Sequence, residues 1–122
     1  MSNHLETEPG SPGNWKRRYT RIPTPVGLWV AWENATGREV SRVRELNAGG
    51  MFIATANPPE VGATLEVLLS VPEGEIRAKA IVRNVAPGEG MGVELLDLRG
   101  EQAARFRELL KRLIQKAETA LG

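Results

Sequence analysis

The spacing of hydrophobic and polar positions changes once along the chain. Between residues 28 and 96 the apolar residues form short runs, several of them alternating with polar residues, and Gly, Pro or Asn follows most runs. The predicted strands cover residues 28–33, 40–46, 51–54, 64–71, 76–83 and 91–96. No helical pattern separates them, and parallel pairing needs long crossover connections. The pattern therefore predicts an antiparallel sandwich or small barrel.

From about residue 101 to 120 the apolar positions recur at helical spacing, which predicts one amphipathic helix. Its apolar positions are Phe106, Leu109, Leu110, Leu113, Ile114, Ala117 and Leu121, and its polar face carries Arg105, Glu108, Lys111, Arg112, Gln115 and Lys116. We expect this helix to cover an open side or end of the barrel. Because the apolar stripe is long for so small a barrel, a partner-binding or dimerising face is a second possible role.

The length of 122 residues allows one domain with a modest core. We expect a flexible N-terminal tail over residues 1–14 and the domain over residues 15–120. The chain has no cysteine, which excludes disulfides and thiol nucleophiles. No apolar run approaches the roughly 20 residues that span a bilayer, and the first twelve residues lack the apolar region of a signal peptide. The expected location is the cytoplasm, with no membrane contact.

The residues that usually carry catalysis are scarce. The single histidine, His4, lies in the predicted tail, and Asp97 is the single aspartate. No serine stands in a nucleophile-elbow motif, and no His, Asp or Glu residues have metal-ligand spacing. The sequence therefore predicts a protein that is not an enzyme and has no metal or cofactor.

Positive charge is concentrated just before the first strand. Four of the six residues from 16 to 21 are basic (Lys16, Arg17, Arg18 and Arg21), although the net charge of the chain is only +1. Guanidinium groups bind phosphate and the Hoogsteen edge of guanine with paired hydrogen bonds. A small anionic nucleotide is the first ligand class to consider, but these residues alone favour the common alternative, a solvated charge run.

A second segment, residues 44–53, contains adjacent glycines between two predicted strands. Glu45 and Asn47 are two residues apart, so on a strand they point to the same side. A carboxylate there can accept the N1–H and N2–H donors of guanine, and Gly50 leaves room for a ligand to approach closely. Alone, the segment favours a plain hairpin bend with solvated Glu and Asn.

Together, the two segments resemble the PilZ domain family, in which two motifs bind cyclic di-GMP, a bacterial second messenger. Arg17-Arg18-Tyr19-Thr20-Arg21 corresponds to the Arg-x-x-x-Arg motif, and Glu45-Leu46-Asn47-Ala48-Gly49-Gly50 to the Asp/Asn-x-Ser-x-x-Gly motif. The resemblance covers roughly residues 15–117. It implies a mainly β fold: a six-stranded antiparallel β-barrel with a C-terminal amphipathic helix.

The resemblance also implies roles for the basic residues. Arg17 and Arg21 are expected to bind guanine edges and phosphates, with Arg18 as a supporting charge. In some members of this family the residue just before the first motif influences whether one ligand or an intercalated pair binds. Lys16 stands there, and its charge favours the more anionic pair.

The second motif departs from the family pattern at two positions. Glu45 stands where Asp or Asn is usual, and Asn47 stands where Ser is usual. The resemblance implies that both hold the guanine Watson–Crick edge or the ribose-phosphate, and that Gly50 permits close approach. Losing one charge-assisted hydrogen bond to the longer Glu45 would weaken binding roughly ten- to a hundredfold.

The leading hypothesis is a non-catalytic cyclic di-GMP receptor, monomeric or weakly dimeric, whose ligand orders the N-terminal segment and so signals to an unidentified protein. The alternative is a PilZ-like interaction module that no longer binds the nucleotide and uses the helix or the strand face of Arg77, Lys79 and Arg83. A nucleic-acid-binding barrel ranks third, because aromatic residues make up only 5% of the chain and the net charge is near zero.

Overall fold

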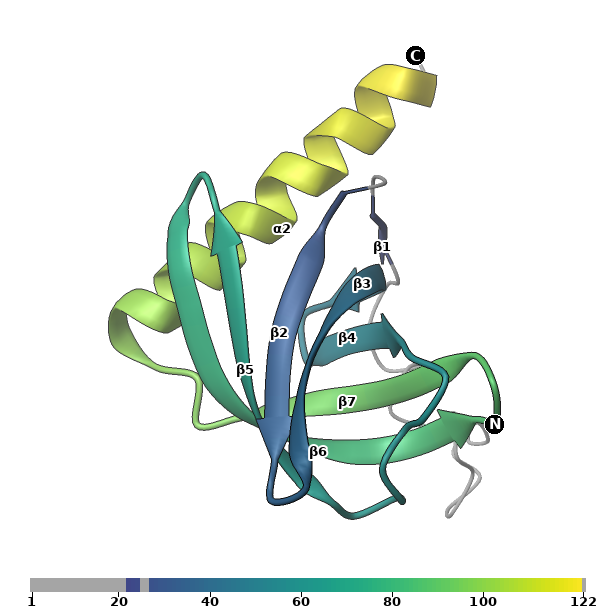
Figure 1. The fold of residues 1–122 in the computed structure, drawn as a ribbon. Helices are drawn as coiled ribbons and strands as arrows, with labels where there is room; N and C mark the ends of the chain where they lie inside the picture. The colour runs from purple at the N-terminus through teal and green to yellow at the C-terminus, as the bar shows by residue number, and fades with distance from the viewer. Residues whose placement is uncertain (1–21, 25–26, 122) are drawn as a thin grey trace, which may run out of the picture.

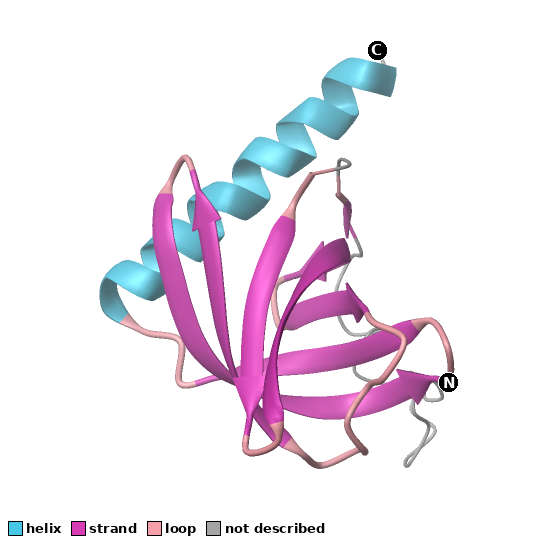
Figure 2. Ribbon diagram, in the orientation of Figure 1, coloured by secondary structure: helices cyan, strands magenta, loops and turns pink. Residues whose placement is uncertain are grey.

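The structure of the protein, a computed structural model, describes residues 22–24 and 27–121. Strands make up most of this part of the chain, and one helix follows them (Figures 1 and 2). The elements are β1 (Ile22–Pro23), β2 (Trp29–Asn34), β3 (Gly37–Asn47), β4 (Gly50–Ala54), β5 (Thr64–Val71), β6 (Gly74–Ala86), β7 (Gly90–Leu96) and α2 (Gly100–Leu121).

The strands pair in the order β1-β3-β2-β5-β6-β7-β4, and β4 also pairs with β3. This last pairing closes β2 to β7 into a six-stranded barrel, in which every pairing between described strands is antiparallel. The predicted mainly β fold, a six-stranded antiparallel barrel with a C-terminal helix, is confirmed. The two-residue strand β1, which pairs with β3 outside this ring, was not predicted.

Two strands are longer than the sequence pattern predicts. β3 begins at Gly37 because the β2–β3 turn is tight: the Asn34 side-chain Oδ1 accepts the backbone N–H groups of Thr36, at 3.0 Å, and of Gly37, at 3.2 Å. β6 extends to Ala86, three residues beyond the alternating run. Turn chemistry, and not hydrophobic alternation, therefore sets the start of β3.

The core lies inside the barrel, and strand alternation determines which side chains reach it. On β6, Ile76, Ala80 and Val82 are buried, while Arg77 and Arg83 are exposed, as the sequence predicts. Fully buried side chains from the other strands meet them there, namely Val30, Val43, Leu46, Met51, Ile53, Leu69, Met91 and Val93.

Helix α2 closes the barrel with the first part of its apolar stripe. Phe106, Leu109 and Leu113 are buried in the same core, and the helix lies mainly against β6 and also beside β1. Beyond Leu113 the helix extends past the barrel (Figure 1), and Ile114 is 40% exposed. The covering role predicted for the helix is confirmed for this half. In the part of the chain that the structure describes, no helix is long and apolar enough to cross a membrane.

The polar face of α2 is less solvated than the periodicity suggested, because part of it lies on the β5–β6 turn. Arg105 Nη1 donates to the backbone oxygen of Glu75 at 2.8 Å, and Gln102 Oε1 accepts the backbone N–H of Arg77 at 2.6 Å. Arg112 forms an ion pair with Glu73 in the same turn. Apolar and polar contacts together therefore fix the orientation of the helix.

Candidate ligand-binding site

A β-bulge reorganises the outer face of β3 just before the second motif. The pairing of β3 with β4 shifts register between Val43 and Glu45, so Arg44 is an extra residue. Val43 and Leu46 are fully buried in the barrel, which leaves Arg44 and Glu45 both on the outer side. Asn47, two residues beyond Glu45, lies on that side too. The sequence expectation that Glu45 and Asn47 share a face agrees with this arrangement.

The turn after β3 is held by the Asn47 side chain. Asn47 pairs with Gly50 across the turn, and its Oδ1 accepts the backbone N–H of Gly49 at 2.7 Å. The Gly49 oxygen in turn accepts the backbone N–H of Leu95 on β7 at 2.8 Å. Asn47 is only 3% exposed, so it is not the solvated side chain of a plain bend. Among the described residues its side-chain amide N–H₂ group donates to no acceptor.

Gly50 is required here by the barrel itself. A Cβ atom at Gly50 would lie 1.9 Å from the backbone oxygen of Val93 on β7. Gly90 has the same role on the neighbouring strand, where a Cβ would lie 2.2 Å from the backbone oxygen of Ile53. We expected Gly50 to make room for a ligand; the group that approaches it is the β7 backbone.

The chain enters the barrel directly beside this turn. In β1, Ile22 pairs with Leu46 and Pro23 pairs with Glu45. Thr24 extends the contact, because its backbone N–H donates to the Arg44 oxygen at 3.3 Å and its hydroxyl donates to the Val43 oxygen. The structure thus brings the residue that follows the basic segment next to the second motif. The sequence signal for β1 was slight, a single apolar residue after a basic run.

Four predicted site residues, Lys16, Arg17, Arg18 and Arg21, lie outside the described residues. The other three, Glu45, Asn47 and Gly50, lie together at the β3–β4 turn. In the described ranges no group of three or more His, Cys, Asp or Glu side chains is placed to hold a metal ion.

The family model described as PilZ domain matches residues 16–116, which is most of the chain. The chain belongs to the PilZ domain family. The resemblance inferred from the two motifs is thereby confirmed. No curated protein sequence matches the chain.

Solved structures with this fold include the PilZ domain of YcgR from Escherichia coli with c-di-GMP. Its TM-score is 0.69 at 16% identity, covering 87% of this chain and 97% of that one. MrkH of K. pneumonia in its apo state gives a TM-score of 0.73 at 17% identity, covering 83% and 50%. The Bacillus subtilis inhibitor of motility (MotI/DgrA) gives 0.64 at 22% identity, covering 82% and 52%. The chain spans about half the length of the latter two structures. At these identities the likeness concerns the fold.

Two arginines on the outer face of β3 adjoin the second motif of this PilZ domain, and the sequence analysis gave them no role. Arg44 is the exposed bulge residue, and Arg42, two residues earlier, pairs with Trp29 of β2. The Arg42 Nε is buried and has no hydrogen-bond acceptor in the described residues. The register shift that exposes Arg44 could not be read from hydrophobic alternation.

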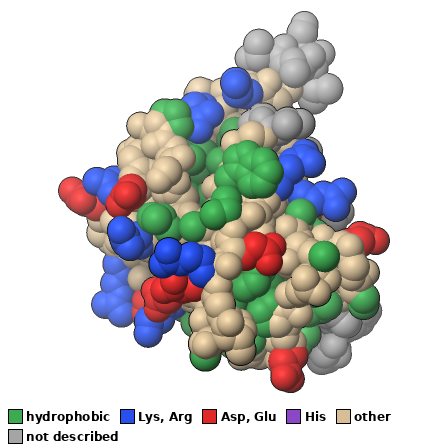
Figure 3. All heavy atoms as spheres, in the orientation of Figure 1, with side chains coloured by type: hydrophobic (Ala, Val, Ile, Leu, Met, Phe, Trp, Pro, Cys, Tyr) green, Lys and Arg blue, Asp and Glu red, His purple; other side chains and the backbone are tan. Residues whose placement is uncertain are grey.

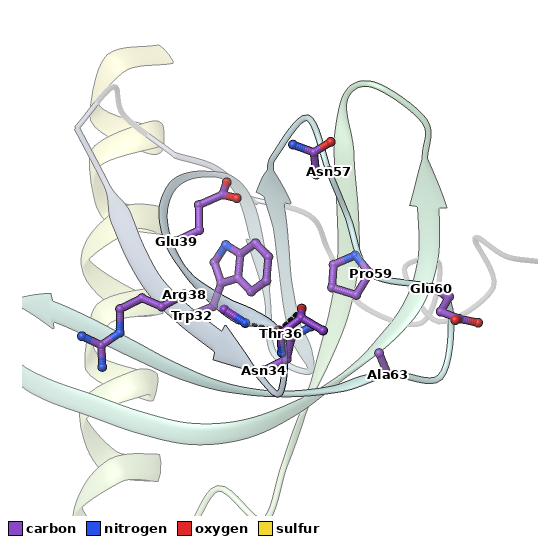
Figure 4. Close-up of a pocket in the computed structure, with 10 residues that line it drawn as sticks. Trp32, Asn34, Thr36, Arg38, Glu39, Asn57, Pro59, Glu60 and Ala63 are labelled. Carbon is purple, nitrogen blue, oxygen red and sulfur yellow. Dashed lines mark hydrogen bonds between the residues drawn. The ribbon is translucent and has the colours of Figure 1, made fainter.

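A pocket of about 470 Å³ lies at the opposite end of β3, between the β2–β3 turn and residues 57–63 (Figure 4). Trp32 and Glu39, which line it, are linked through Ser41: Trp32 Nε1 donates to Ser41 Oγ at 2.9 Å, and the Ser41 hydroxyl donates to Glu39 Oε2 at 2.7 Å. Figure 4 shows the Trp32 ring between Glu39 and Pro59. These bonds satisfy polar groups at the end of the barrel, several residues along β3 from Glu45.

Proposed function

We propose that this PilZ domain is a cyclic di-GMP receptor that does not itself catalyse a reaction. The observation that carries the proposal is the pairing of Ile22 with Leu46. Arg21 directly precedes Ile22 in the sequence, and Asn47 directly follows Leu46. The last residue of the first motif is therefore bonded to a residue that pairs with the second motif. A ligand that needs both motifs at once would then find them close to each other on the barrel.

The chemistry of the two segments matches the two parts of the ligand. The Glu45 carboxylate, half-buried on the outer face, would accept the N1–H and N2–H donors of a guanine. The Asn47 amide would donate to the ribose-phosphate. Arg17 and Arg21 would bind the guanine O6 and N7 atoms and the phosphates with paired hydrogen bonds, which are strong when both groups are charged.

Lys16 and Arg18 add two positive charges to the same short segment. Together with Arg17 and Arg21 they offset the two phosphodiester charges of one ligand, and the surplus favours an intercalated pair of ligands. The structures of the YcgR PilZ domain and of MrkH with c-di-GMP support this ligand class for the family. Residues 15–120 would form the functional unit, with residues 1–14 outside it.

The signal would pass through β1. A ligand bound between residues 16–21 and the β3–β4 turn would hold the N-terminal segment against β3, and β1 lies beside α2. Binding would therefore change the surface formed by the segment and the helix, which a downstream protein could recognise. The effect depends on a difference in free energy between the free and bound arrangements.

Isothermal titration calorimetry of the full chain with cyclic di-GMP, at two salt concentrations, tests the proposal. We expect saturable binding that weakens with salt. Cyclic di-AMP should bind far more weakly, because adenine lacks the N1–H donor and the O6 acceptor. The double variant Arg17→Ala/Arg21→Ala should abolish binding. The matched variant Arg38→Ala/Arg77→Ala, which loses the same charge elsewhere, should not. No heat near millimolar ligand would overturn the proposal.

A second candidate function is a protein-interaction module without nucleotide binding. Two large apolar side chains on the outer face of β2 and β3 favour it: Trp29 is 51% exposed and Val40 is 62% exposed. On the face drawn in Figure 3, hydrophobic side chains lie among basic and acidic ones. This function predicts that Trp29→Ser weakens partner binding, whereas Arg17→Ala/Arg21→Ala leaves it intact.

A further inference from the structure

We propose that Arg42 and Arg44 extend the nucleotide site along the outer face of β3 and bind a phosphodiester group of the ligand. The inference rests on the proposed function and adds two residues that lie outside both motifs. It places part of the phosphate-binding charge on the barrel, independent of the N-terminal segment.

The bulge places the first of these cations beside the guanine-binding carboxylate. In a regular strand, Arg44 and Glu45 would point to opposite faces. The register shift between Val43 and Glu45 puts both on the outer side instead. Each guanosine of a cyclic dinucleotide adjoins a phosphodiester, so a guanine held by Glu45 brings a phosphate close to Arg44. Bulges commonly redirect side chains in this way next to functional sites.

Arg42 lies on the same outer face of β3, two residues before Arg44. Its Nε is buried without an acceptor in the described part of the chain, and an unsatisfied buried donor is unfavourable. Arg42 as a whole is only partly buried, and Trp29, the residue opposite it on β2, is half exposed. A phosphate oxygen would supply the missing hydrogen-bond acceptor.

The other arginines differ from these two. Of the nine arginines in the described residues, six have a carboxylate within 4.0 Å, among them Arg38, Arg77 and Arg83 on the strands. The exceptions are Arg42, Arg44 and Arg107 of α2. In the described part of the chain, Arg42 and Arg44 thus stand beside the second motif without a carboxylate within 4.0 Å, as is expected of residues that bind an anion.

The test compares two double variants that remove equal charge. Arg42→Gln/Arg44→Gln and Arg38→Gln/Arg77→Gln each change the net charge of the full chain from +1 to −1. Cyclic di-GMP affinity is measured by calorimetry at low and high salt, and thermal unfolding of each variant is recorded alongside. We expect Arg42→Gln/Arg44→Gln to weaken binding at least about tenfold and to reduce its salt dependence. The Arg38→Gln/Arg77→Gln variant should stay within about twofold of wild type.

Equal affinities for the two double variants would overturn this inference while leaving the receptor function intact. Absence of binding by the wild-type chain would overturn the receptor function itself and this inference with it. If Arg42→Gln/Arg44→Gln unfolds, Arg44→Gln alone replaces it, because Arg44 is exposed and its side chain makes no bond among the described residues. That variant should weaken binding by at least about threefold, and an unchanged affinity would contradict the proposal.

Discussion

Glu73 and Arg112, 39 residues apart in the chain, form a two-point ion pair that fastens the β5–β6 turn to α2. Arg112 Nε donates to Glu73 Oε2 at 2.6 Å, and Arg112 Nη2 donates to Glu73 Oε1 at 3.1 Å. The Glu73 side chain is 13% exposed and that of Arg112 is 34% exposed. The hydrogen bond from Arg112 lowers the pKa of Glu73, and the same bond raises the pKa of Arg112.

This pair predicts a pH-dependent loss of stability when Glu73 is replaced by Gln. Because folding lowers the pKa of Glu73, its contribution is present above the unfolded-state pKa of about 4.5 and is lost as the pH falls through the folded-state value. At pH 7, Glu73→Gln should reduce the free energy of unfolding by about 1 kcal/mol. Well below pH 4.5 the variant and the wild type should converge, as measured by urea unfolding.

Glu33→Gln is the matched control, because Glu33 pairs with Arg38 at 3.0 Å but both side chains are largely exposed. Screening by water should keep its cost below about 0.5 kcal/mol at pH 7. If the two variants lost the same free energy, or if the deficit of Glu73→Gln persisted at pH 3, the role given to the Glu73–Arg112 pair would be wrong.

Gly50→Ala should destabilise the barrel strongly. The added Cβ would lie 1.9 Å from the Val93 oxygen, so the β4 and β7 backbones must move apart. We expect the free energy of unfolding to fall by about 2 kcal/mol or more. Gly37→Ala is the control, since nothing lies within 4 Å of its added Cβ. Denaturant titration measures the free energy of unfolding of both variants. A Gly50→Ala variant that kept its stability and lost only ligand affinity would contradict the structural role of Gly50.

The sequence predicted the barrel strands because each alternating position faces either the core or the solvent. Ile76 and Val82 of β6 are buried and Arg77 is exposed, as the pattern required. The second motif could be placed for the same reason, since the strand and its turn residues are local features. The α2 stripe was also predicted from the sequence; its residues Phe106, Leu109 and Leu113 are buried on the barrel, whereas Ile114 and Ala117 are exposed.

Contacts between distant segments could not be predicted in the same way. β1 has two residues, one of them a proline without an N–H, and what holds it is its place beside β3. The requirement for glycine at position 50 comes from Val93, and the bulge at Arg44 comes from the register between β3 and β4. Such features depend on which distant backbones meet, and the local pattern of hydrophobic and turn residues does not show this.

Thr24→Val should weaken ligand binding more than it weakens the barrel. The Thr24 hydroxyl donates to the Val43 oxygen and so holds the chain after β1 along β3. Valine keeps the shape but loses the donor, at a cost of about 1 kcal/mol to the docked arrangement. Cyclic di-GMP affinity should fall roughly fivefold, because the ligand must then offset this cost.

Thermal unfolding of Thr24→Val should stay close to that of wild type, because the barrel strands keep their own pairings. Thr36→Val serves as the control: among the described residues the Thr36 hydroxyl bonds only Asn34 Oδ1, at 2.9 Å, in the exposed β2–β3 turn. Equal affinities for Thr24→Val and Thr36→Val would show that β1 docking does not contribute to the site.

Glu45→Gln tests the central polar contact of the proposed site with almost no change in shape. A carboxylate presents acceptors to both guanine donors, whereas the Gln amide presents one acceptor and one donor, and its N–H₂ group would face a guanine N–H. We expect affinity for cyclic di-GMP to fall at least about tenfold in calorimetry.

Glu66→Gln provides the control, because Glu66 is exposed on β5 and its loss changes the net charge by the same amount. Asn47→Ser separates the turn from the ligand contact. Serine retains a side-chain oxygen for the Gly49 N–H, so stability should stay within about 0.5 kcal/mol. Asn47→Ala removes that acceptor and should cost about 1 kcal/mol. If Glu45→Gln bound as tightly as Glu66→Gln, the guanine would not lie against Glu45, and the departure of this motif from Asp or Asn would reflect a different ligand orientation.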